Sequence, residues 1–409
     1  MEKSATLRMN EQMQDFVAHG IPALNLGFGE CGLPVLPVLR ELVASGSAEN
    51  AYPAVQGSLA ARRAIAGYFS RRGIPSEAGL CTVAPGSKPI LYALLATLPG
   101  DLVLPRPSWV SYANQSRALG KPVIWVDAPA DCGGIPAPDQ LETALGTARA
   151  AGRDPRILLL TSPDNPTGTV ASGEQMRALV RIAAEQDLTI ISDEIYRDLA
   201  YSPADYVSPA ELAPDRTIVT SGLSKNLALG GWRIGVARFP VTDRGREQLA
   251  RFVGFASELW SGMPVFLEPV VEYTFSEPAD VVERIAASRR LHQAVSTAIA
   301  GVLRDAGARV HLPEGGFYLY PSFRGTALAE RLHAATDEEL SNRLLGRERV
   351  GVLPGTCFGD DPAQLRVRVV TAMVYGASDP ERLATLRAAD PLQAPPVVAA
   401  LERLRNVLA

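Results

Sequence analysis

The sequence predicts an α/β fold, with a large domain built on a mostly parallel sheet flanked by helices and a smaller α+β domain. Along the middle of the chain, short and continuous apolar runs alternate with helical patterns, which is typical of parallel strands covered on both faces. After about residue 275 the pattern changes to a long helical stretch and a few short strands. The length of 409 residues also exceeds the usual size of one domain.

The elements of the large domain are predicted in order along the chain. A short strand at 81–83 is followed by apolar runs that read as buried strands at 101–105, 122–126, 156–161, 188–192, 217–220 and 233–237. Helical patterns lie between them at 87–98, 140–151 and 172–186. Open α/β sheets bind ligands outside the carboxyl ends of their strands, so we expect the functional residues there.

The smaller domain is predicted from both ends of the chain. A long helix at 279–306 leads into short strands at 316–320, 350–353 and 365–370, and helical segments at 8–18 and 35–45 could join this unit. We therefore predict a large domain at 46–280 and a small domain formed by 1–45 and 281–409.

Composition excludes several classes of protein. The net charge of −4 and the pI of about 5.8 leave no basic surface for nucleic acid or an anionic membrane. The four cysteines are isolated and the four histidines are not paired at ligand spacing, which argues against a metal site and a disulfide framework. No apolar run reaches the length of a membrane span and no signal pattern is visible, so a cytoplasmic protein is expected.

Lysine is scarce in this chain, which has 40 Lys and Arg residues but lysines only at positions 3, 88, 121 and 225. Lys225 lies among small residues in TSGLSKNLALGGWRIG, residues 220–235. Lysine forms Schiff bases with carbonyl cofactors, and small residues let a backbone approach a bulky ligand closely. Arg233 offers a fixed cation suited to a phosphate. An ordinary surface lysine in a turn is the alternative interpretation.

Two further segments suggest a site for a phosphorylated ring. Gly86 and Ser87 follow the strand at 81–83 and begin a helix, where free backbone N–H groups and the helix dipole favour an anion. Trp109 follows the next strand and could either stack on an aromatic ring or belong to the core.

Polar residues end the next two predicted strands. Asn165, in the turn at 162–168, could donate to a phenolate oxygen or bind a carboxylate, or it could be an ordinary Asn-Pro turn. Asp193 ends a buried strand and needs a cationic partner or several donors, which a protonated pyridine nitrogen would supply; a helix N-cap is the alternative. Tyr196, three residues on, could bond the neighbouring ring oxygen.

The order of these motifs resembles the class I/II aminotransferases, which are fold-type I pyridoxal-phosphate enzymes. The resemblance runs from residues 26–30 to the arginines at 366–368, and its specific parts are Asn-Pro-Thr-Gly, Asp-x-x-Tyr and the segment around Lys225. It implies pyridoxal 5'-phosphate as cofactor, Lys225 as the internal aldimine lysine and Asp193 as the partner of the ring nitrogen. The other cofactor contacts that it implies are Asn165 and Tyr196 at the ring oxygen, Trp109 over the ring, and Gly86, Ser87, Ser224 and Arg233 around the phosphate.

The resemblance also implies residues that bind substrate. These are Gly29, Asn165 and an arginine for the α-carboxylate, for which Arg366 and Arg368 are both candidates; Arg368 is preferred because the residues after it continue more like the family pattern. Lys88 either lies near the distal carboxylate of an acidic substrate such as glutamate or aspartate, or it only supports the phosphate or faces solvent.

Tyr52 resembles the tyrosine that reaches the phosphate of a neighbouring subunit, which implies a homodimer with a shared active site. Two departures from the family stand out. The opening Gly-Glu-Pro-Asp is here Gly-Glu-Cys-Gly, residues 29–32, and Gly222 replaces a phosphate-binding serine that many members have, with Ser221 as a potential substitute.

The resemblance predicts transfer of an amino group between an α-amino acid and a 2-keto acid. Elimination, cyclisation, oxidation and decarboxylation use the same cofactor-holding residues and remain alternatives within the fold. An effector-binding domain of a regulator is a different class, which is disfavoured because Lys225 is intact and no basic region is visible.

Overall fold

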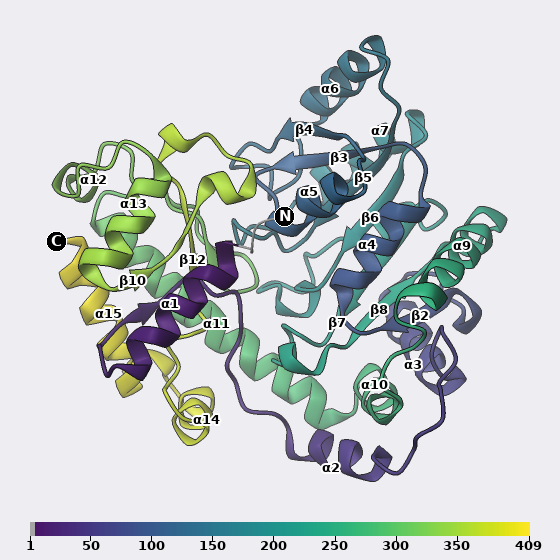
Figure 1. Cartoon of the computed structure of the whole chain (residues 1–409), viewed down its shortest axis with the longest axis horizontal. Helices are drawn as coiled ribbons and strands as arrows, with labels where there is room; N and C mark the ends of the chain where they lie inside the picture. Colours follow the sequence, from purple (N-terminus) through teal and green to yellow (C-terminus); the bar gives the residue numbers. More distant parts are fainter. Residues whose placement is uncertain (1–4) are drawn as a thin grey trace.

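The computed structural model describes residues 5–409, with side chains from residue 9 onward except that of residue 17. Its centre is a seven-stranded sheet in the order β2-β8-β7-β6-β5-β3-β4 (Figure 1). The strands are β2 (Cys81–Ala84), β3 (Asp101–Arg106), β4 (Val123–Asp127), β5 (Pro155–Thr161), β6 (Thr189–Asp193), β7 (Thr217–Gly222) and β8 (Gly235–Arg238). All run in one direction except β8, which is antiparallel to both β7 and β2. The predicted mostly parallel α/β sheet is confirmed.

Helices cover both faces of this sheet. Leu102 and Leu104 of β3 pack with one group of helices, and Val103 between them packs with the other. The first group is α4 (Ser87–Thr97), α5 (Val110–Ala118) and α9 (Asp243–Leu259), and the second is α6 (Pro138–Ala150) and α7 (Gly173–Glu185). Because both sides of the central strands are buried, these strands read as continuous apolar runs.

The remaining helices of this part of the chain lie at the β2 edge or close to β6 and β7. They are α2 (Pro37–Gly46), α3 (Leu59–Ser70), α8 (Pro209–Leu212) and α10 (Glu268–Phe275). Short 3₁₀ turns lie at Ala78–Leu80, Arg197–Leu199 (η2), Gly230–Trp232 (η3) and Val265–Leu267.

A second unit is built around the long helix α11 (Ala279–Asp305), which Figure 1 shows running away from α10 toward the C-terminal elements. Its strands are β9 (Tyr318–Leu319), β11 (Leu353–Pro354) and β12 (Val367–Val370), which pair antiparallel, while β1 (Leu24–Asn25) pairs parallel with β10 (Val350–Gly351). Its other helices are α1 (Ala5–Ala18), α12 (Ala327–Arg331), α13 (Asp337–Arg343), α14 (Asp379–Arg387) and α15 (Pro395–Leu408). Irregular helical turns lie at Leu344–Glu348, Gly355–Phe358, Pro362–Gln364 and Pro391–Gln393.

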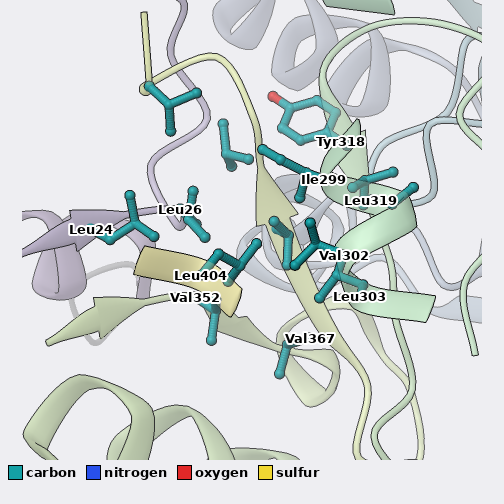
Figure 2. Packing of buried hydrophobic residues seen from close by; sticks show 14 of the residues in the cluster. Leu24, Leu26, Ile299, Val302, Leu303, Tyr318, Leu319, Val352, Val367 and Leu404 are labelled. Carbon is teal, nitrogen blue, oxygen red and sulfur yellow. The ribbon is translucent and has the colours of Figure 1, made fainter. Parts of the chain in front are cut away.

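The second unit has a hydrophobic core that joins both ends of the chain. Figure 2 shows Leu24 and Leu26 from the N-terminal segment beside Val352, Val367 and Leu404 from the C-terminal part. Helix α2, in contrast, packs with α3 and α10 at the β2 edge of the large sheet. The boundaries at residues 46 and 280 stay a prediction.

None of the described helices is both long enough and apolar enough to cross a membrane.

Candidate active site

A cavity of about 470 Å³ lies where β5, β6 and β7 end and α4 begins. This is the carboxyl edge of the sheet, where the sequence places its functional residues. The cavity brings together eleven of the predicted site residues: Gly29, Ser87, Lys88, Trp109, Asn165, Asp193, Tyr196, Ser224, Lys225, Arg233 and Arg368. Gly86, Tyr52 and Arg366 are not part of its lining, although Gly86 lies against Arg233, which is.

Asp193 is a buried carboxylate at the end of β6, with only 2% of its surface exposed. Its Oδ2 accepts a hydrogen bond from the Tyr112 hydroxyl at 2.8 Å, and its Oδ1 accepts one from the Thr220 hydroxyl at 3.1 Å. Burial raises its pKa to about 6, and no cation of the described chain pairs with it. The η2 turn that follows begins later, with Tyr196 at its N-cap, so Asp193 is not a helix cap. The carboxylate is therefore ready for a cationic ligand.

Lys225 lies in the loop that leads from β7 into η3. Its Nζ donates a hydrogen bond to the backbone carbonyl of Gly29 at 2.5 Å. Gly29 belongs to the segment between β1 and α2, so the ammonium joins the sheet to the N-terminal segment. A Cβ at position 29 would lie 2.8 Å from the Tyr318 hydroxyl, so a larger residue there would require this tyrosine to shift.

Positive charge gathers where α4 begins. Gly86 has a φ of +101°, and a Cβ there would lie 2.2 Å from a guanidinium nitrogen of Arg233. Partial burial lowers the pKa of Lys88, and the charges of Arg233 and Lys225 lower it further. Among residues 5–409, no carboxylate forms an ion pair with these three cations. Unpaired cations beside a helix N-terminus fit a phosphate group.

Arg368 and Arg366 occupy different environments although they lie two residues apart. The Arg368 side chain is 98% buried; Nη1 donates to Asn165 Oδ1 at 3.1 Å and Nη2 donates to the Gly27 carbonyl at 2.9 Å. Its Nε is buried without a partner, and burial lowers its pKa. Arg366 instead pairs with Asp360 at 2.8 Å, away from the cavity. The geometry favours Arg368 as the group that binds a carboxylate.

The Asn165 amide lies between Arg368 and two tyrosines. Its Nδ2 donates to the Tyr196 hydroxyl at 3.5 Å, and that hydroxyl lies 2.7 Å from the Tyr318 hydroxyl. The turn is held by Asp164, whose Oδ2 accepts hydrogen bonds from the backbone N–H and the hydroxyl of Thr167 at 3.0 and 2.6 Å.

Trp109 lines the cavity and meets Tyr112 edge to face, with ring centroids 5.2 Å apart. The Lys88 Nζ lies 5.2 Å from the centre of the same indole. The indole therefore forms part of the wall of the site while it packs against the hydrophobic core behind it.

The departure at Gly222 has a steric reason. A Cβ at this position would lie 2.4 Å from the Ile234 carbonyl oxygen, so a serine side chain does not fit. The neighbouring Ser221 does not take over its role, because its hydroxyl donates to the Glu194 carbonyl and does not line the cavity.

Tyr112 and Tyr318 are site residues that the sequence reasoning missed. Tyr112 lies three residues after Trp109 in the first turn of α5, and that spacing is the only signal that could have pointed to it. Tyr318 lies on the short strand β9, far from every motif in the sequence.

Comparison with known proteins shows which family and which fold the chain shares. The model of the family described as aminotransferase class I and II matches residues 21–375. The chain is 29% identical over 379 residues to aspartate aminotransferase from Geobacillus stearothermophilus, covering 90% of this chain and 92% of the relative. It is 30% identical over 387 residues to aspartate/prephenate aminotransferase from Cereibacter sphaeroides, covering 91% and 93%. The structure of Thermus thermophilus aspartate aminotransferase with maleate superposes with a TM-score of 0.84 at 26% identity, covering 100% of this chain and 97% of that one.

Proposed function

Since the chain belongs to the aminotransferase class I and II family, we propose that Lys225 is the lysine that binds its cofactor, and that an acidic amino acid is one of its substrates. The protein is a pyridoxal-phosphate-dependent aminotransferase, which transfers an amino group between an amino acid and a keto acid. The roles of individual residues and the choice of substrate are our proposal.

The observation that carries the proposed residue roles is a pair of unmatched buried charges. Asp193 and Arg368 line one cavity, and neither has an oppositely charged partner within the described part of the chain. Such groups are costly to bury unless a ligand completes them. A ligand with a ring cation at one end and a carboxylate at the other would match both.

The residues fit the cofactor as follows. Asp193 would hold the ring nitrogen; Asn165 and Tyr196 would face the ring oxygen; Trp109 would lie against the ring. The phosphate would lie at the start of α4, among Gly86, Ser87, Ser224 and Arg233. When bound, pyridoxal phosphate supplies a carbonyl that condenses with amines and a ring that draws electrons from the substrate α-carbon.

The chain's own groups then bind and move protons. Arg368 binds the substrate α-carboxylate with its two terminal nitrogens, and Asn165 keeps the guanidinium in place. The Lys225 amine removes a proton from the substrate α-carbon and returns it, since it is the amine that reaches the cavity from the β7 loop. Tyr112 and Thr220 keep the Asp193 carboxylate ionised and correctly oriented.

Chemical mapping tests the lysine directly. Reduction of the loaded enzyme with borohydride should fix the cofactor on Lys225, while Lys88 and Lys121 serve as internal controls in the same digest. Lys225→Ala should abolish turnover. Label on Lys88 or Lys121 would refute the assignment.

The acidic substrate is proposed from Lys88 and from the relatives. Several curated relatives are named aspartate or aspartate/prephenate aminotransferases, and Lys88 brings a positive charge to the cavity wall without an ion-pair partner among the described residues. We expect one half-reaction to accept glutamate or aspartate.

The test is Lys88→Ala, measured with alanine and glutamate as donors. It should weaken kcat/KM for glutamate about tenfold more than for alanine, because only glutamate has a distal carboxylate for Lys88 to contact. Such a contact binds the ground state and the transition state alike, so its loss changes the discrimination between the two donors. Lys121→Ala is the matched control, since Lys121 binds the carbonyls of Leu98 and Gly100. An equal loss for both donors would assign Lys88 to the cofactor phosphate instead.

We also propose a homodimer that shares its active sites. Tyr52 is 95% exposed, as expected for a side chain that serves another subunit. Leu59, Leu259 and Phe266 are exposed apolar side chains in nearby stretches, and Pro53 contacts Gly262 between the last two. Exposed apolar groups of this kind are typical of an interface.

A cytoplasmic location belongs to the same proposal. It is supported by the buried thiols of Cys31, Cys81 and Cys132, which form no disulfide, as expected in a reducing compartment.

A further inference from the structure

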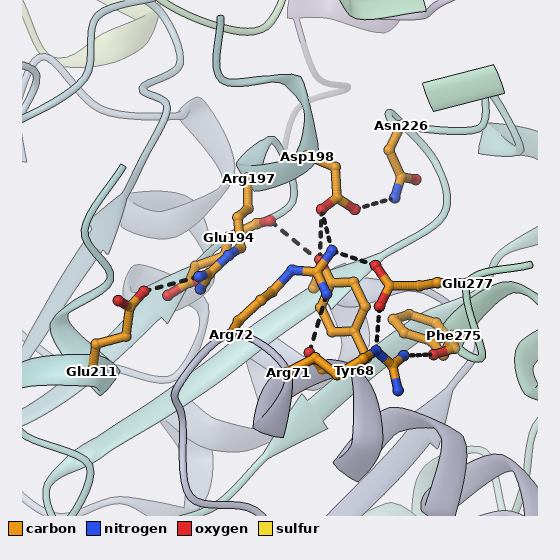
Figure 3. Close-up of polar contacts among 11 residues, drawn as sticks. Tyr68, Arg71, Arg72, Glu194, Arg197, Asp198, Glu211, Asn226, Phe275 and Glu277 are labelled. Atoms are coloured by element: carbon orange, nitrogen blue, oxygen red, sulfur yellow. Dashed lines mark hydrogen bonds and ion pairs between the residues drawn. The ribbon is translucent and has the colours of Figure 1, made fainter. Parts of the chain in front are cut away.

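A carboxylate outside the cavity accepts hydrogen bonds from three side chains (Figure 3). Asp198 receives the Tyr68 hydroxyl at 2.8 Å, a terminal nitrogen of Arg72 at 3.1 Å and the Asn226 amide nitrogen at 2.9 Å. Its side chain is 10% exposed and does not line the cavity that holds Lys225. The family motifs in the sequence do not include this residue.

The position of Asp198 in the chain connects it to the site. It lies in η2, two residues after Tyr196, and its partner Asn226 directly follows Lys225. One carboxylate therefore ties the turn that presents Tyr196 to the loop that presents Lys225.

The buried side chain of Asn226 satisfies only part of its hydrogen-bonding capacity. The residue is buried, its Nδ2 binds Asp198, and its Oδ1 has no hydrogen-bond partner. A buried amide oxygen without a donor is unfavourable, so burial alone does not explain an asparagine here. The backbone bonds of the loop lie at its base, from Leu229 N–H to the Leu223 carbonyl, which leaves the Asn226 amide as an anchor next to the lysine.

The other side of Asp198 is fixed to rigid elements. Tyr68 lies in α3 and Arg72 follows its end. Arg72 also pairs with Glu277 at 2.5 Å, and Arg71 pairs with the same carboxylate at 2.7 Å. Glu277 lies at the junction of α10 and α11 with a φ of +58°, a strained conformation that the two arginines help to hold.

We propose that Asp198 is a positioning residue for Lys225, which it holds through the side chain of Asn226 while Tyr68 and Arg72 fix it to α3. The inference takes its functional meaning from the proposed role of Lys225. A reacting amine that moves by about 1 Å can lose about a hundredfold in rate, so an anchor on the adjacent residue matters.

The variants separate the anchor from its surroundings. Asn226→Ala removes the hydrogen bond to Asp198 and leaves Asp198 bonded to Tyr68 and Arg72. Asp198→Ala removes the carboxylate that accepts all three hydrogen bonds. Asp198→Asn should preserve the link, because Asn226 can turn its amide so that its unpaired oxygen accepts from the new amide. Glu211→Gln is the matched control: Glu211 pairs with Arg197 in the adjoining network but does not contact Asn226.

The main readout needs neither cofactor nor substrate, so it is independent of the proposed reaction. Cofactor-free protein is treated briefly with acetic anhydride, and acetylation of Lys225 is measured by mass spectrometry relative to Lys121. We expect the ratio to change at least threefold in Asn226→Ala and Asp198→Ala, and to stay within about 1.5-fold in Asp198→Asn and Glu211→Gln. In the loaded enzyme, Asn226→Ala should lower kcat about tenfold with KM changed less than twofold, because Arg368 is untouched.

Asn226→Ala decides the outcome, since it removes only one side chain's amide and remains informative even where Asp198→Ala does not fold. A labelling ratio equal to that of the wild type in Asn226→Ala overturns the proposal, whatever happens to turnover. Failure of borohydride mapping at Lys225 would overturn the proposed function instead and leave the labelling result standing.

Discussion

At the scale of single residues, the site is defined by charges that the chain itself does not neutralise. A buried guanidinium with an unpaired Nε and a buried carboxylate without a cation would destabilise a protein that had no ligand for them. Arg368 and Asp193 are therefore explained by what binds between them.

Arg368 and Arg366 form a natural pair for testing this view. Arg368→Lys should raise KM for amino acid and keto acid about a hundredfold, because a lysine cannot form the two parallel hydrogen bonds to a carboxylate and leaves it poorly paired in a buried site. Steady-state kinetics with both substrates measures this change.

Arg366→Lys is the control for the same substitution on the same strand. Its guanidinium faces Asp360 in a partly exposed pair, so KM should change less than threefold. A larger effect at Arg366 than at Arg368 would reverse the assignment.

Sequence reasoning at this scale succeeded where a residue belongs to a local motif. Asp193 ends β6, Asn165 and Lys225 lie in the segments that follow β5 and β7, and all three line one cavity. Tyr112 and Tyr318 were not identified from the sequence, because they join the site through packing between distant segments. A tyrosine in a helix or a short strand carries no local signal of such a role.

At the scale of elements, the turn after β5 contains a second buried carboxyl. Asp164 has 2% of its surface exposed and holds Thr167 in the turn that presents Asn165. Burial raises its pKa to about 7, from a usual value of 3.8, against the opposing effect of the Thr167 hydrogen bonds. The titratable group that faces it is Tyr112, whose own pKa burial raises.

This carboxyl predicts a pH dependence of stability. A carboxyl whose pKa is raised in the folded protein favours folding while it is protonated, so its contribution is present below about pH 4 and is lost as the pH rises to about 7. The shift corresponds to a contribution on the order of 4 kcal/mol. Asp164→Asn should therefore flatten the fall in Tm of the cofactor-free protein between about pH 4 and about pH 7, with a residual slope from Asp193.

Asp187→Asn supplies a control of opposite sign. Arg244 holds the pKa of Asp187 below its usual value, so this carboxylate stabilises the fold at neutral pH and loses that effect only in acid. Identical Tm profiles for Asp164→Asn and the wild type would show that Asp164 does not titrate in this range.

The order of the elements and the mostly parallel sheet could be predicted, whereas the reversed direction of one strand could not. The segment expected to form a strand at 233–237 does form β8, which begins at Gly235, but it runs antiparallel to its neighbours. A buried apolar run has the same pattern in either direction, because both faces are covered. The two-residue strand β1 was not predicted, since it is too short to show a period of two.

At the scale of the whole molecule, one side of the active site is open. Lys88 and Arg233 at the start of α4 are exposed to solvent, and Tyr52 projects from the surface without a partner of its own in the described structure. Sequence reasoning could propose that these features meet across two subunits only through family resemblance, because nothing in one chain specifies the position of a second.

Mixed dimers test that arrangement. Lys225→Ala lacks the cofactor lysine, and a severely impaired Tyr52 variant lacks the group offered to its neighbour, so each homodimer should be nearly inactive. In a two-fold symmetric dimer the mixture contains one intact site per heterodimer. If half of the dimers are mixed, refolding the two variants together at equal amounts should restore about a quarter of the wild-type activity.

The control is a mixture of Lys225→Ala with Asp193→Ala. Both residues line the same cavity of one subunit. In this heterodimer one site lacks Lys225 and the other lacks Asp193, so neither site is intact. Recovery in the Tyr52 mixture but not in this one would show that Tyr52 acts across the interface. A stable monomer with full activity at low concentration would contradict the shared site, because Lys88 and Arg233 would then bind the phosphate with no help from a second subunit.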